Sequence, residues 1–180
     1  MVDAGQIIEQ TKKWISDVVI GCNFCPFAAN VVKQQTVFYR IVESRSVATC
    51  LASFAEELIR LDDDKNIETS FLIFPVAITS FTEYLDLVDR AEQLLKQNGY
   101  DGIYQVASFH PMYCFADAEE NDAANYTNRS IYPMLHLLRE ASIDKALLNY
   151  KDPEAIPERN INFAREKGLV YMKMLRDACM

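Results

Sequence analysis

Ile103-Tyr-Gln-Val-Ala-Ser-Phe109 runs directly into His110-Pro111, and this junction opens the stretch that decides the fold. The seven residues are typical of a β-strand, and Pro111 ends it. The loop that follows spans roughly 20 residues, a length that is uncommon in compact domains and is often functional. Pro133 to Glu140 is then a short apolar segment that predicts a helix. We therefore expect a functional site at the carboxyl end of this strand.

Two further segments, 36–43 and 69–74, are rich in the β-branched and aromatic residues of strands. Helical spacing and start and stop signals predict helices over 3–20, 46–64, 80–98, 142–149, 157–167 and 169–180. The sequence thus predicts a single α/β domain over 1–180, with a small, mainly parallel central sheet of about three strands surrounded by about six helices. A ferredoxin-like α+β arrangement is the alternative if a fourth strand lies in 113–115.

The composition restricts the class of protein. The net charge of -8 argues against nucleic acid or an anionic membrane as a partner, because phosphate binding requires a basic surface. No window approaches the roughly 18 continuous apolar residues of a membrane span, and the N-terminus lacks the pattern of an export signal. The five cysteines are an odd number, which favours reduced thiols over a disulfide framework. We therefore expect a cytoplasmic protein.

His110 is the first candidate site residue. It lies immediately beyond a strand, where ligands gather at the edge of parallel sheets. An exposed imidazole at that position suits general acid–base catalysis, metal ligation or anion binding. The alternative is a structural histidine that holds loop backbone.

The loop residues before the predicted helix make a candidate anion cradle. Amides, an arginine and the free N–H groups of a helix start all favour a carboxylate or phosphate. The residues are Asn125, Asn128, Arg129 and Ser130, with Arg159 as a second positive group and His136 on the predicted helix. The alternatives are a loop braced by its own side chains and, for His136, a packed histidine.

Cys25 is the remaining candidate. The spacing Cys22-x-x-Cys25 permits a redox pair or half of a zinc site, but the apolar neighbours Phe24 and Phe27 also fit a packed, inert thiol. A reactive Cys25 alone is a further alternative. A metal site would need His110 and His136 to approach Cys25.

Several motifs resemble one known family. They are Gly21-Cys-Asn-Phe-Cys-Pro-Phe-Ala28, Gln105-Val-Ala-Ser-Phe-His-Pro111, Ala124-Asn-Tyr-Thr-Asn-Arg-Ser130, Tyr132-Pro-Met-Leu-His-Leu-Leu-Arg-Glu-Ala141 and Ile156-Pro-Glu-Arg-Asn160. They are similar to the bacterial family known as domain of unknown function 1415, over nearly the whole chain. The resemblance implies no activity or cofactor, but it draws attention to the site residues named above. Cys22 departs from the family pattern, where an aliphatic residue is expected.

Three functions follow as hypotheses. The first is an enzyme that acts on a small anionic metabolite, with His110 as acid–base group, Cys25 as nucleophile or pocket wall, and the Asn/Arg cradle holding the anion. The second is a non-catalytic anion-binding or regulatory module. The third is a metal-binding protein that uses Cys25, His110 and His136. The apolar loop residues would also permit a homodimer.

Overall fold

A computed structural model describes residues 3–148 and 150–180. The strands in this part of the chain are β1 (Val37–Ile41), β2 (Thr69–Ile73), β3 (Tyr104–Phe109) and β4 (Met134–Arg139). The α-helices are α1 (Ala4–Trp14), α2 (Ala28–Lys33), α3 (Val47–Asp63), α4 (Phe81–Gln97), α5 (Glu140–Leu147), α6 (Ile156–Lys167) and α7 (Leu169–Asp177). A π-helix, η1 (Ile15–Ile20), and two 3-10 helices, η2 (Ala123–Thr127) and η3 (Pro153–Ala155), complete the elements.

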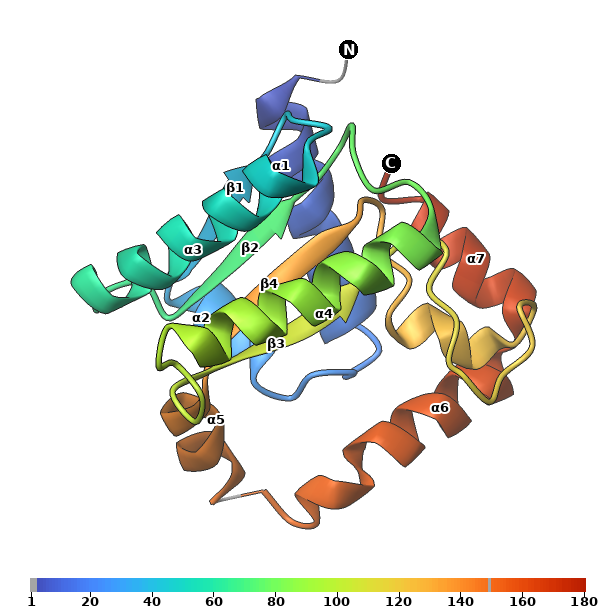
Figure 1. Cartoon of the computed structure of the whole chain (residues 1–180). Helices are drawn as coiled ribbons and strands as arrows, with labels where there is room; N and C mark the ends of the chain where they lie inside the picture. The colour runs from blue at the N-terminus through green and yellow to red at the C-terminus, as the bar shows by residue number, and fades with distance from the viewer. Residues whose placement is uncertain (1–2, 149) are drawn as a thin grey trace.

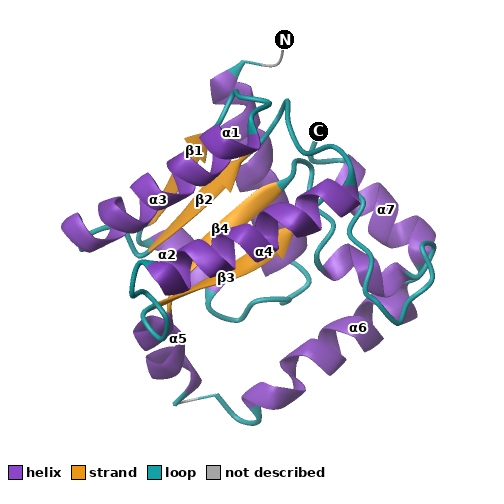
Figure 2. Cartoon of the chain, viewed as in Figure 1, coloured by secondary structure: helices purple, strands orange, loops and turns teal. Residues whose placement is uncertain are grey.

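The strands form one mixed sheet in the order β1-β2-β4-β3 (Figure 2). β1 and β2 pair in parallel, whereas β4 is antiparallel to both of its neighbours. The prediction of an α/β fold is therefore confirmed, and so are the three predicted strands. The sheet has four strands rather than three, and it is mixed rather than mainly parallel in its pairing.

The prediction of a helix over 133–140 is wrong, because residues 134–139 form β4. Leu135 and Leu137 face one core and Met134 faces the other, so apolar residues are needed on both faces of this central strand. A short apolar run of this kind cannot be assigned to helix or strand by its periodicity. The fourth strand thus lies here and not in 113–115. The order β-α-β-α-β-β also differs from the β-α-β-β-α-β order of a ferredoxin-like fold.

The predicted helices are found at 3–20, as α1 with η1, and as α3, α4, α6 and α7. The helix expected over 142–149 corresponds to α5, and its expected last residue lies outside the described part of the chain. α2 has no counterpart among the predictions. No helix in the described residues has the length and apolarity needed to cross a bilayer.

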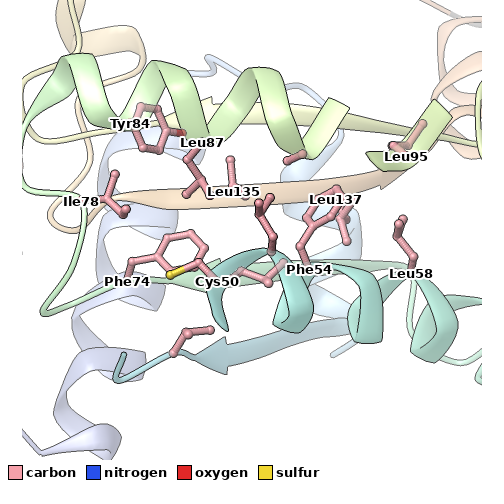
Figure 3. Packing of buried hydrophobic residues seen from close by; sticks show 14 of the residues in the cluster. Cys50, Phe54, Leu58, Phe74, Ile78, Tyr84, Leu87, Leu95, Leu135 and Leu137 are labelled. Carbon is pink, nitrogen blue, oxygen red and sulfur yellow. The ribbon is translucent and has the colours of Figure 1, made fainter. Parts of the chain in front are cut away.

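Helices cover the two faces of the sheet and enclose two cores. α3 and α4 lie side by side on one face (Figure 1), and the first core fills the space beneath them. Phe54 and Leu58 of α3 meet Leu87 of α4 over Leu135 and Leu137 of the sheet (Figure 3). On the opposite face, the second core is built from α1, η1, η2, α6 and α7. The long loop and the C-terminal helices therefore belong to the second face.

The first helix ends as a π-helix, and Gly21 follows it directly. π-helical turns are rare, and those that occur often lie at functional sites. A Cβ at Gly21 would overlap the backbone oxygen of Asp17, so the chain can turn towards Cys22 only where the side chain is absent. Gly21 is thus needed for the close approach of two backbone segments.

Replacing Gly21 by alanine should lower the free energy of unfolding by about 2 kcal/mol, because the backbone must shift to relieve the overlap. Urea denaturation followed by circular dichroism measures this loss. Gly5→Ala in α1 is the matched control, since its Cβ would meet only a side-chain oxygen of Asp3. The control should be neutral or stabilising by about 0.5 kcal/mol. Equal effects of the two substitutions would contradict the role of Gly21.

Candidate functional site

His110 is buried, with only 1% of its surface exposed. Its Nδ1 accepts the Met112 N–H at 3.0 Å, so the ring proton lies on Nε2, which donates to the Ile78 carbonyl at 3.0 Å. Burial lowers the pKa of His110, which favours this neutral form. The expectation of an exposed imidazole is therefore wrong. Both ring nitrogens are hydrogen-bonded to backbone groups. One of these belongs to Ile78, which has a left-handed φ of 57°.

His136 lies on β4 and not on a helix. Its ring stacks on Phe71 with the centroids 3.8 Å apart, and its Nε2 lies 2.5 Å from the Thr69 hydroxyl oxygen. The Thr69 hydroxyl donates to the Leu137 carbonyl, so His136 is the donor in their hydrogen bond. Burial lowers the pKa of His136 to about 3, and the ring is uncharged. These contacts match the packed histidine that the sequence left as the alternative.

The low pKa of His136 predicts a loss of stability in acid. An unfolded histidine binds a proton below about pH 6.5, whereas folded His136 does not until about pH 3. Falling pH therefore favours the unfolded chain across this window, by up to about 1.4 kcal/mol per pH unit. Urea unfolding at several pH values measures the slope. His136→Gln, which keeps a donor for Thr69, should flatten it, and an unchanged slope would contradict the assignment.

Asn125 is fully buried in the loop and uses its amide on backbone groups. Its Oδ1 accepts the Phe115 N–H at 3.0 Å, and its Nδ2 donates to the Glu119 carbonyl at 2.9 Å. Asn128 donates through Nδ2 to the Ser108 carbonyl at 3.1 Å, which ties the loop to the end of β3. Both amides therefore hold the chain in place.

Arg129 has 7% of its surface exposed and lies inside the loop. Its Nε donates to the Tyr113 carbonyl at 2.9 Å and its Nη2 to the Glu120 carbonyl at 2.8 Å. The hydroxyl of Ser130 likewise donates to the Tyr132 carbonyl. The braced-loop alternative accounts for all of these contacts. An anion-binding role for these groups stays a prediction. To bind an anion, they would have to break their hydrogen bonds to the backbone carbonyls.

Arg159 and Asn160 of α6 reach across to the turn that carries Cys25. Arg159 Nη2 donates to the Asn23 carbonyl at 2.5 Å, and Asn160 Nδ2 donates to the Phe24 carbonyl at 2.7 Å. Asn23 has a left-handed φ of 55°, a conformation that asparagine tolerates better than most residues. The guanidinium of Arg159 thus stabilises a strained turn.

A cavity of about 270 Å³ lies between this turn, the end of β3, the long loop and α6. Its walls are Val19, Phe24, Cys25, Phe109, Phe115, Thr127, Asn128, Ile156, Pro157, Asn160 and Ile161. Four of the motifs quoted above meet here, through Cys25, Phe109, Asn128 and Asn160. We call this cavity the Cys25 pocket. It brings together two of the predicted site residues, Cys25 and Asn128.

Cys25 is the titratable side chain on the pocket wall. Burial raises the pKa of its thiol, while the backbone N–H groups of Phe27 and Ala28 act in the opposite direction. The thiol is therefore protonated at neutral pH. Cys22 is buried in the second core, and both cysteines are free.

The structure does not bring together the three residues of the metal hypothesis. The ring of His110 packs against Phe81 and Tyr84 of the first core, whereas His136 packs against Phe71 of the second. Among residues 3–148 and 150–180, no group of three histidine, cysteine or acidic side chains has an arrangement that could hold a metal ion.

A family model described as protein of unknown function (DUF1415) matches residues 6–174. The chain belongs to this family. No curated protein and no solved structure matches the chain.

Sequence reasoning does not single out Asn160, Thr127 or the apolar walls of this DUF1415 pocket. Asn160 ends the Pro157-Glu-Arg-Asn160 motif, which is a sequence signal for this residue. The positive charge of the neighbouring Arg159 makes Arg159 the more obvious candidate for a binding residue. Val19, Ile156 and Ile161 resemble ordinary helix-face residues. Nothing in their spacing distinguishes the wall of a cavity from a packed core.

Proposed function

We propose that this protein binds a small, uncharged and mainly apolar molecule in the Cys25 pocket. The observation that carries the proposal is the composition of the walls, which are apolar or neutral and include no charged side chain among the described residues. An apolar cavity of about 150 Å³ accommodates benzene, so a cavity of about 270 Å³ has room for a ring with several substituents. Ligand sites are commonly apolar with a few polar groups that fix orientation.

The polar groups of the pocket are few and neutral. Asn128 and Asn160 each use one amide N–H on a backbone carbonyl, and an amide nitrogen has two. Each can therefore offer one more hydrogen bond. The Thr127 hydroxyl and the Cys25 thiol complete the set. A carboxylate or phosphate remains the alternative ligand, but it requires Arg129 or Arg159 to release a carbonyl.

Catalysis by Cys25 is a second candidate function. Its support is the pair of backbone N–H groups, from Phe27 and Ala28, that favour a thiolate. Burial opposes them and leaves the pKa raised, so the thiol is a weak nucleophile at neutral pH. Binding is accordingly the function that the geometry supports better, and His110 takes no part in either.

The fluorescence of Trp14 provides a measurement of ligand binding in the pocket. It is the chain's one tryptophan, and its ring lies edge-on to the pocket residue Phe109, with centroids 5.1 Å apart. A thermal-shift screen of neutral single-ring compounds and small anions should yield neutral ligands that also change Trp14 fluorescence. At about 100 times its dissociation constant, a ligand adds roughly 2.7 kcal/mol to the stability.

Ile161→Phe is the decisive variant, because the larger ring fills the pocket from α6. It should abolish the response to the neutral ligand and leave the fold intact. Ile59→Phe is the matched control, since Ile59 lies on α3 with 56% of its surface exposed. Neutral ligands that still bind Ile161→Phe would overturn the proposal. So would a screen in which only anions bind and Arg129→Ala abolishes their binding after correction for the loss of stability of the variant.

A further inference from the structure

We propose that the first half of α6, residues 156–161, is a flap that opens by local unfolding and controls access to the Cys25 pocket. This inference rests on the proposed function for its purpose, but its physical content is a property of the unliganded chain. Opening would widen the access of a ligand to the pocket, and closing would reduce the contact of that ligand with water. Three observations carry the inference.

The first observation is the distribution of burial along the C-terminal part of the chain. From Glu140 to Phe163, no described residue is fully buried, whereas Ala164 is completely so. Segments with little buried apolar surface open at lower free energies than the core. Ala164 is thus the first buried residue after Leu137 in the described chain, and it lies inside α6, four residues after Asn160.

The second observation is how the two halves of α6 are attached. The second half is anchored by Ala164 and by a bidentate pair in which Arg165 Nε and Nη2 donate to the two carboxylate oxygens of Asp122. The first half has Ile156, Pro157 and Ile161 along the hollow pocket, where they lack the dense packing of a core. α6 also begins without a side-chain cap. Opening of the first half alone thus costs few contacts.

The third observation is the nature of the closing contacts. Arg159 and Asn160 donate to the backbone carbonyls of Asn23 and Phe24 in the Cys25 turn. Water can replace either donor when the flap opens, so the contacts can break and re-form without leaving a buried group unpaired. These bonds close the flap on the same turn that presents Cys25 to the pocket. Cys25 is partly buried in the closed chain, so opening should raise the reactivity of its thiol above a basal rate.

Cysteine alkylation of the whole chain tests the inference without any ligand. Iodoacetamide labelling, quantified by mass spectrometry, gives the separate rates of Cys25 and Cys50. Cys50 is fully buried in the first core and therefore reports global unfolding. Cys25 should react faster than Cys50 in the native protein, but more slowly than in the urea-unfolded chain at the same pH.

Asn160→Ala should accelerate the labelling of Cys25 about five- to tenfold, the factor that corresponds to one lost hydrogen bond. The rate at Cys50 should not change. Asn162→Ala is the matched control, because it makes the same substitution on the exposed side of the same helix. It should leave both rates as they are.

The inference is overturned if Cys25 and Cys50 react at one rate, because access to the pocket would then require global unfolding. It is equally overturned if Asn160→Ala and Asn162→Ala have the same effect, or if native Cys25 reacts as fast as in the unfolded chain. None of these results depends on a ligand. A gated Cys25 with no ligand in the fluorescence screen would contradict the proposed function alone.

Discussion

Replacing Glu57 by alanine is expected to lower the free energy of unfolding by about 3 kcal/mol. The Glu57 carboxylate is fully buried beneath α3. It accepts hydrogen bonds from Arg40 Nη1 at 3.1 Å, from Arg60 Nε at 2.9 Å and from the Ser70 hydroxyl at 2.7 Å. The substitution would leave Ser70 without its acceptor and Arg40 without its buried counter-charge. Both arginine side chains remain partly exposed to solvent. The expected loss of stability therefore lies at the lower end of the range for breaking a buried ion pair.

Urea denaturation monitored by circular dichroism measures this effect, and the chain supplies a close control. Glu56 is the preceding residue on α3, and its carboxylate also pairs with Arg40, but 62% of its side chain is exposed. Glu56→Ala should therefore cost less than about 1 kcal/mol. If the two alanine variants were equally stable, burial of the Glu57 carboxylate would not be the cause of its contribution to stability. Glu57→Gln should recover part of the loss, since its amide oxygen can still accept from one donor.

Much of the fold could be predicted because local signals and tertiary structure agree. The strand ending at Phe109 is bounded by His110-Pro111. Ser46 precedes α3 as its N-cap, and its side chain accepts the Thr49 N–H. β4 could not be predicted because its leucines favour a helix in isolation. Its strand conformation depends on pairing with β2 and β3, which are distant in the sequence.

The site was harder to predict than the fold, for a physical reason. Polar loop residues such as Asn125 and Arg129 have the same composition whether they bind a ligand or their own backbone. Only their partners distinguish the two roles, and those partners are carbonyls that every sequence contains. The Cys25 pocket likewise arises from segments more than a hundred residues apart. The motifs could be recognised individually, but their meeting point depends on the tertiary structure.

Arg129→Ala is the second substitution for which a large effect is expected, again a loss of about 3 kcal/mol in the free energy of unfolding. The guanidinium is buried in the loop, and it lies over the Tyr126 ring at 5.0 Å from the centroid. Alanine would leave the Tyr113 and Glu120 carbonyls without their charged donor. Arg129→Lys should recover less than half of the loss, since an ammonium cannot reproduce the planar fork of donors.

Urea unfolding of Arg129→Ala discriminates between the two roles of the loop. Arg45→Ala, at an exposed loop position, is the matched control and should change the stability by no more than about 0.5 kcal/mol. If Arg129→Ala were as stable as this control but no longer bound an anion, the arginine would be a ligand and not a brace. If instead the variant is destabilised, anion screens that depend on Arg129 must first be corrected for unfolding. The stability measurement therefore has to precede any assignment of Arg129 to a binding site.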